Sequence, residues 1–239
     1  MVYKKFLSFL VLMFLLLSTT AFLPKSGFDN KELKSNALKG GEELNIEEVY
    51  RNLHSDGFGL PKLESFKVAL QGFNKLKAQG VVSRNILTLI DFSLSSNIKR
   101  LWVIDLDTDT VLIHSLVAHG RNTGEEFANS FSNAAESYKS SLGFYVTGEV
   151  YNGKHGKSLR LDGLEKGIND NARNRAVVVH GADYVSDSFI QNNKRLGRSL
   201  GCPAVPVEIT DDLISAIKDR SCLFIYYPSD SYLHSSKFI

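Results

Sequence analysis

The stretch Ala176-Val177-Val178-Val179-His180-Gly181 centres on three valines and ends in a histidine and a glycine. Such a run predicts a short buried strand, because β-branched side chains favour the extended backbone. Five further short runs are also rich in β-branched, aromatic and other apolar residues: Ile86–Phe92, Arg100–Leu106, Thr110–Ala118, Phe144–Tyr151 and Cys222–Tyr227. Beyond Val82 the sequence therefore predicts a mainly β domain.

Three segments carry helical signals instead. Asn45 followed by Glu48 is a capping-box-like start for a first helix. A second helix is predicted by apolar residues at helical spacing and a closing Gly80: Phe66, Ala69, Leu70, Phe73 and Leu76. Thr210 is expected to cap a late helix. We predict a helical N-terminal segment over 44–80, a mainly β domain with peripheral helices over 81–228, and a polar C-terminal tail over 229–239.

The first residues have the pattern of a secretory signal peptide. Lys4-Lys5 precedes the apolar run Phe6–Leu17, and small residues follow up to Ala21. This run is too short to cross about 30 Å of hydrocarbon as a helix, although a retained signal anchor is the alternative. Residues 22–43 are expected to be a flexible linker. The mature protein is then exported to the periplasm or cell envelope, where nucleotide cofactors are scarce.

The composition is that of a globular domain with a core. The chain has 239 residues, of which 43% are hydrophobic and 23% charged. Its formal net charge of +2 falls to zero without Lys4 and Lys5, and the other Lys and Arg residues are scattered. Nucleic acid and anionic membrane surfaces are therefore not expected as partners. The membrane is expected to matter only through the export signal.

A second segment, Gly197-Arg198-Ser199-Leu200-Gly201-Cys202-Pro203, is rich in turn residues and contains a cysteine. With His180 at the end of its strand, Cys202 forms a candidate catalytic pair, because a nearby imidazole favours the reactive thiolate. Acyl transfer also needs backbone N–H groups that face the developing oxyanion, and Gly201 allows that close approach. These two segments hold the strongest chemical signal in the sequence.

Two structural interpretations compete with this pair. His180 could be a core histidine, and Cys202 could form a disulfide with Cys222. Alternation along the last strand places Cys222 on one face with Phe224 and Tyr226, as expected for a small core residue. We therefore expect Cys222 to be structural and Cys202 to be free.

A metal site and a serine hydrolase are weaker candidates. His114, His119, His155 and His180 could in principle gather around zinc, but His114 and His119 have odd spacing and are expected to point to opposite faces of a strand. The sequence has no HExxH or CxxC motif. Gly197-Arg198-Ser199-Leu200-Gly201 matches the letters of G-x-S-x-G, but no predicted strand leads directly into it and no predicted helix follows it directly, so a nucleophile elbow is not expected there. We expect no metal and no other cofactor. The Ser/Asn-rich stretch Gly120–Ser141 has the length of a functional loop or lid.

His180-Gly181 followed by Ser199-Leu200-Gly201-Cys202 resembles the signature of the murein L,D-transpeptidases, which are YkuD-like cysteine transpeptidases. Further segments are similar to the branch called the murein L,D-transpeptidase catalytic domain family: Leu101–Asp105, Val117–Gly120, Ser141–Tyr145, Leu161–Gly163 and His180–Tyr184. The resemblance runs from about Leu60 to Tyr227. It implies a mainly β, β-sandwich-like catalytic domain that acts on peptidoglycan stem peptides in the cell envelope without a cofactor.

The resemblance also implies residue roles. Cys202 would be the nucleophile and His180 its base, with the carbonyl of Gly181 orienting the imidazole. Gly201, Leu200 and Ser199, together with the N–H of Cys202, would form the oxyanion hole or orient the groups around it. The family usually has a histidine where this chain has Leu200. For the substrate, Arg195 and Arg198 are candidates to bind a carboxylate, and Tyr184 and His119 are weaker lining candidates.

The implied reaction is a cysteine acyl transfer on a tetrapeptide stem through a thioester on Cys202. Capture of the thioester by a second stem gives a cross-link, and capture by water gives L,D-carboxypeptidase activity. A catalytically inactive wall-binding module is the alternative from another class. NlpC/P60-like peptidases have the cysteine before the histidine, and sortases carry a Thr-Leu-x-Thr-Cys context that is missing here. No obligate protein partner is evident in the sequence.

The leader makes the first testable prediction. Export and cleavage after Ala21 should give a mature chain that begins at Phe22. Intact-mass spectrometry of protein recovered from the cell envelope measures this directly. Recovery of membrane-bound chains that still carry Met1 would support the signal anchor instead.

Overall fold

The computed structural model describes residues 45–239 of the chain, so the predicted signal peptide and linker lie outside the described residues. A single eight-stranded sheet forms the centre of this part, in the order β3-β2-β1-β8-β4-β5-β6-β7. The strands are β1 (Ile86–Asp91), β2 (Leu101–Asp105), β3 (Thr110–Ser115), β4 (Gly143–Gly153), β5 (Gly156–Gly163), β6 (Val178–Gly181), β7 (Ala204–Val205) and β8 (Cys222–Tyr226). The predicted mainly β domain is confirmed.

The sheet is nearly closed on itself. Beyond β3 the chain reaches the opposite edge, where Ala118 N–H donates to Ala204 O in β7 at 2.8 Å. The neighbouring strands pair antiparallel except for β1 with β8 and β6 with β7, which are parallel. Strands β1 and β8 are buried along their whole length, which explains their nearly continuous apolar sequences.

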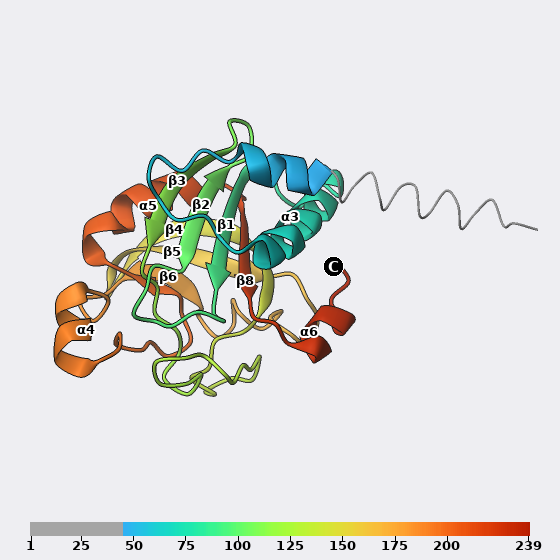
Figure 1. Cartoon of the computed structure of the whole chain (residues 1–239). Helices are drawn as coiled ribbons and strands as arrows, with labels where there is room; N and C mark the ends of the chain where they lie inside the picture. Colours follow the sequence, from blue (N-terminus) through green and yellow to red (C-terminus); the bar gives the residue numbers. More distant parts are fainter. Residues whose placement is uncertain (1–44) are drawn as a thin grey trace, which may run out of the picture. The chain divides into compact units, whose positions relative to one another are not determined.

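Helices cover the sheet, as Figure 1 shows. Residues 45–52 are helical, and α3 (Leu63–Ala78) packs on β1 and β8. The residues predicted to form its apolar face are buried, and Gly80 follows with a φ of +68°. The other helices are α4 (Asp187–Asn193), α5 (Thr210–Ile217) and α6 (Asp230–Ser235). Among residues 45–239, no helix has the length and apolarity needed to cross a membrane.

Several elements differ from the sequence-based expectation. Strands β5 and β7 and helix α4 were not predicted, although Leu159 and Leu161 alternate with Arg160 in β5 as a half-buried strand requires. The late helix is present, but Thr210 does not cap it. A 3-10 turn, Val207–Ile209, precedes the helix, and the Thr210 hydroxyl donates to Pro206 O at 2.9 Å instead.

The C-terminal residues contribute to the core, unlike the polar tail expected for 229–239. Tyr232 and Phe238 are buried, with 4% and 3% of their surfaces exposed. The buried carboxylate of Glu165 holds this segment, because it accepts hydrogen bonds from Tyr232 Oη at 3.0 Å and from Ser236 Oγ. Two aromatic anchors among many serines give a weak apolar pattern, which explains why the sequence alone did not reveal α6.

Cys222 is free and completely buried at the start of β8. It lies opposite Leu87 of β1 in the parallel register and opposite Val146 of β4. Burial raises the pKa of its thiol. The structure therefore confirms that Cys222 is a small core residue and is not bonded to Cys202.

Gly72 tests the packing of α3 on the sheet. A Cβ on Gly72 would run into the ring of Phe144, which stacks on Phe224 with centroids 4.1 Å apart. Gly72→Ala gains about 1 kcal/mol of helix propensity but overpacks the core at a cost of about 1–3 kcal/mol. We expect a net loss of about 1 kcal/mol in the free energy of unfolding, measured in urea. Asn74→Ala, at an exposed position of the same helix, should not destabilise, and equal effects of the two substitutions would contradict the tight contact.

Candidate active site

His180 lies near the end of β6 between two other strands. It pairs with Ser158 of β5 on one side and with Ala204 of β7 on the other, and its side chain is only 3% exposed. The ring Nδ1 lies 2.9 Å from Gly181 O. Because a carbonyl oxygen only accepts, Nδ1 carries the proton in the neutral ring and Nε2 is left as the acceptor. Burial lowers the pKa of His180, which favours this neutral form.

The turn before Cys202 depends on a glycine. Gly201 has a φ of +126°, and a Cβ on it would lie 2.9 Å from Lys139 O, so only glycine fits this position without strain. Ser140 Oγ donates to Gly201 O at 3.1 Å. Ser199 Oγ accepts from Gly201 N–H at 3.0 Å and donates to Cys202 O at 2.6 Å. Ser199 therefore orders the turn that presents the cysteine.

This turn also corrects one expectation about the oxyanion donors. The N–H of Gly201 is used inside the turn by Ser199 Oγ. A donor that is already bonded within the turn does not face a substrate carbonyl. The N–H groups of Leu200 and Cys202 are the candidates that remain.

The thiol of Cys202 lies beside the strand that carries His180. Val178 N–H points at Sγ with a distance of 3.4 Å, and Sγ lies 3.7 Å from Ala176 O. Burial raises the pKa of the Cys202 thiol, whereas the Val178 N–H and the charge of Arg175 act in the opposite direction.

Cys202 and His180 share a cleft of about 440 Å³. Its walls come from the turn of the β4–β5 hairpin, the segment 175–178, Tyr184 and the segment 198–202. Three cationic side chains line it, Lys154, Arg175 and Arg198, and no carboxylate among the described residues does. The cleft thus combines a candidate nucleophile, a candidate base and a positive potential.

Arg175 was not identified from the sequence. Its guanidinium donates to Ser132 O at 2.8 Å and to Lys139 O at 2.6 Å, so it ties the 132–141 loop to the start of β6. It also places a positive charge near the thiol, and the two groups influence each other's pKa. In the sequence, the only indication of this role is that Arg175 is a cation just before the run Ala176–Val179. The fold is needed to show that Arg175 lies near Cys202.

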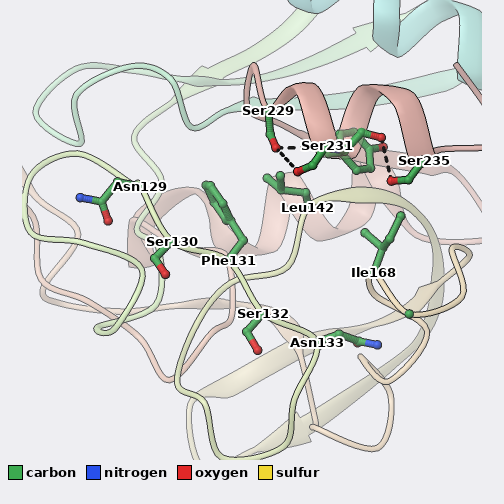
Figure 2. Close-up of a pocket in the computed structure, with 12 residues that line it drawn as sticks. Asn129, Ser130, Phe131, Ser132, Asn133, Leu142, Ile168, Ser229, Ser231 and Ser235 are labelled. Carbon is green, nitrogen blue, oxygen red and sulfur yellow. Dashed lines mark hydrogen bonds between the residues drawn. The ribbon is translucent and has the colours of Figure 1, made fainter.

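A second cavity of about 470 Å³ shares no lining residue with the first. Figure 2 shows that the loop 129–133 and α6 supply most of its walls, with hydroxyl and amide groups. Its one phenol, Tyr232, is bonded to Glu165. The cavity holds no cysteine, histidine or lysine that could act as nucleophile or base, so the Cys202 cleft is the candidate active site. Within residues 45–239, no three His, Cys, Asp or Glu side chains are grouped to hold a metal ion.

Residues 61–226 match the family model of the L,D-transpeptidase catalytic domain. The chain belongs to this L,D-transpeptidase family. Its match to an L,D-transpeptidase from Mycobacterium smegmatis has 11% identity and a TM-score of 0.37, and it covers 60% of this chain and 59% of that one. The chain thus spans less than two thirds of that structure.

Two further solved structures are similar to this transpeptidase-family chain. For the helical cell shape determining protein Pgp2 from Campylobacter jejuni, the identity is 11%, the TM-score 0.41, and the coverage 67% of this chain and 57% of that one. For an L,D-transpeptidase from Xylanimonas cellulosilytica, the identity is 13%, the TM-score 0.35, and the coverage 77% and 92%. No curated protein sequence gives a significant match.

The two arginines proposed for substrate binding have different positions in this L,D-transpeptidase domain. Arg198 lines the cleft, but its Nη1 donates to Gly124 O at 3.1 Å and to Glu125 Oε1 at 2.6 Å. Arg195 does not line the cleft, and its Nε donates to Glu125 Oε2 at 2.8 Å. Glu125 therefore binds both arginines, and the expectation that Arg195 reaches the substrate is corrected.

His119 is a buried structural residue and does not line the cleft, which corrects another expectation. Its side chain is 1% exposed, and Arg100 Nη2 donates to its Nδ1 at 2.9 Å. Its Nε2 then carries the proton and donates to Gly124 O at 3.2 Å. Burial, together with the charge of Arg100, lowers the pKa of His119 to about 4, so the ring is neutral at physiological pH.

Tyr184 lines the cleft as expected. The chain at Gly197 packs against its side chain, where a Cβ would clash, and Gly197 N–H donates to Tyr184 O at 2.8 Å. Burial and the nearby Cys202 raise the pKa of its phenol to about 12. Tyr184 therefore remains a protonated hydrogen-bond donor in the cleft at neutral pH.

The charge of Arg175 makes a testable contribution to thiol reactivity. Arg175→Gln removes the cation, so the pKa of Cys202 should rise and iodoacetamide alkylation should require a higher pH. Arg175→Lys keeps the charge but loses the forked hydrogen bonds to the loop. We expect a shift of the alkylation profile by about one pH unit for the glutamine variant and a smaller shift for lysine. Equal shifts would show that loop order, and not charge, controls the thiol; mass spectrometry identifies the labelled cysteine.

Proposed function

We propose that this protein is an exported L,D-transpeptidase that transfers acyl groups between peptidoglycan stem peptides through a thioester on Cys202. One observation carries the proposal: in a domain of this family, the Cys202 thiol and the His180 ring, whose Nε2 is free to accept a proton, share one cleft. Export rests on the leader pattern of the sequence. The proposed substrate class follows from the family.

In the proposed acylation step, Sγ of Cys202 attacks the carbonyl carbon at the L-centre of the diamino acid in a tetrapeptide stem. Nε2 of His180 takes the thiol proton as the C–S bond forms. The tetrahedral oxyanion then collapses, the amide C–N bond breaks, and His180 returns the proton to the departing amine of the terminal D-residue. A thioester remains on Cys202, and the imidazole is neutral again.

The proposed oxyanion donors are the N–H groups of Cys202 and Leu200. Backbone donors in a rigid turn stabilise developing charge without reorganisation, and the Ser199 hydrogen bonds supply that rigidity. The side chain of Leu200 is 56% exposed and lines the cleft, so it offers apolar surface to a substrate. The cations of the cleft favour an anionic stem, and Arg175 and Lys154 have no carboxylate in the cleft wall to compete for them.

The acyl acceptor determines the product. A side-chain amine of a second stem gives a cross-link. Water instead gives L,D-carboxypeptidase activity, which is the alternative enzymatic function. An inactive wall-binding module would retain the cleft but form no thioester.

Labelling with a carbapenem tests the proposal, because these drugs mimic the acyl donor of the family. The purified mature protein should gain the mass of the drug on Cys202, and Cys202→Ala should abolish the adduct. His180→Ala should slow labelling by on the order of 10²–10⁴-fold, because the general base is lost. Cys222→Ala is the matched control and should label normally, since this thiol is buried in the core. If the Cys202→Ala variant were still labelled by the drug and still turned over tetrapeptide stems, the proposed enzyme function would be refuted.

A further inference from the structure

A second imidazole lies on the catalytic one. Strands β4 and β5 pair as far as Gly153 and Gly156, so Lys154 and His155 form the two-residue turn of this hairpin. The ring of His155 stacks on that of His180, with centroids 4.5 Å apart and planes inclined by 24°. His155 is itself exposed, whereas His180 is almost completely covered. The turn therefore supplies a cover for one face of the proposed base.

The hairpin is built to hold this position. The register of β4 with β5 shifts between Thr147 and Val150, and such a bulge bends a hairpin and increases its twist. Nearer the turn, the guanidinium of Arg160 lies 4.6 Å from the ring centroid of Tyr151, a cation–π contact that links the two strands. These contacts order the end of the hairpin that carries His155, the residue that stacks on His180.

We propose that His155 is a positioning residue for His180: its ring covers one face of the catalytic imidazole and fixes the plane of that ring. The inference deepens the proposed function and rests on it. Two contacts then determine where Nε2 points, the hydrogen bond from Nδ1 to Gly181 O and the stack with His155. An imidazole held in this way does not need to be reoriented when the thiol proton is transferred.

The electrostatics of the cleft agree with this role. Burial lowers the pKa of His180 most, the hydrogen bond to Gly181 O raises it, and the smaller electrostatic effects of His155 and then Lys154 lower it. The other titratable or charged groups of the cleft wall are Tyr151 on the same hairpin and, from other segments, Arg175, Tyr184, Arg198 and Cys202. None of these is a carboxylate that would offset a positive charge on the stacked ring. Leu200, which also lines the cleft, adds no charge.

The stacked pair has a consequence for pH dependence. Two imidazoles in face contact do not both become protonated easily, because like charges at this distance repel. His180 therefore stays available as a base to lower pH than it would without His155. Replacement of His155 should raise the pKa of His180, and the acidic limb of acylation should move to higher pH.

Histidine NMR titration of the full mature chain tests this directly, with His180→Gln used to assign the resonance. His155→Phe keeps an aromatic cover but removes the ionisable ring, and His155→Ala removes both the cover and the ionisable ring. We expect the pKa of His180 to rise in both variants, by about 0.5–1 unit in alanine and by less in phenylalanine. Asn152→Ala, at an exposed position of the same hairpin, is the matched control and should leave the titration unchanged.

The pH profile of carbapenem acylation provides the second readout. Its acidic limb should shift in the same order as the NMR values, with little change in thermal stability. An unchanged His180 titration in both His155 variants would overturn the inference. A wild-type chain that fails to acylate while the His180 titration still shifts would support the stacked pair and count against the proposed function alone.

Discussion

The parallel pairing of β6 with β7 is the constraint on which the rest of the structure depends. Strand β7 has only two residues, yet it places Ala204 opposite His180 and so brings the preceding Cys202 level with Val178. The same residue, Ala204, accepts the hydrogen bond from Ala118 that nearly closes the sheet. The near-closure of the sheet and the placement of Cys202 beside the strand of His180 therefore depend on the same feature, because both need β7 in this register.

A buried cation supports the loops around this closure. The Arg100 side chain is fully buried, and it donates to Leu94 O at 2.7 Å and Val117 O at 3.0 Å as well as to His119. Burial lowers its pKa to about 9, so it is still charged at neutral pH. A buried charge is costly unless its donors are satisfied. Here the hydrogen bonds of Arg100 fix Val117 and His119 in the segment that leads to Gly124. Arg198, which lines the cleft, donates to the carbonyl oxygen of Gly124.

The local part of this architecture could be predicted from the sequence, and the long-range part could not. The apolar face of α3 and the Val-rich strand before His180 follow from periodicity and composition over a few residues. By contrast, Arg175 and Cys202 are 27 positions apart, and His155 and His180 are 25 apart. Neither pair has a spacing signal, because sheet order brings them together. His119 was misjudged for the same reason: its environment is set by Arg100, a residue of another segment.

The opposite pKa shifts in the cleft indicate how the pair rests before substrate binds. Burial raises the pKa of the Cys202 thiol and lowers that of His180. Both shifts disfavour a thiolate–imidazolium pair, so the resting state is a neutral thiol beside a neutral imidazole with Nε2 unprotonated. In the proposed reaction the proton therefore moves during the attack, with His180 as a general base instead of one half of a preformed ion pair. A neutral resting pair also protects the thiol from oxidation, because thiolate character controls that reaction. In the proposed reaction, the cations of the cleft then stabilise negative charge only as it develops on substrate and sulfur.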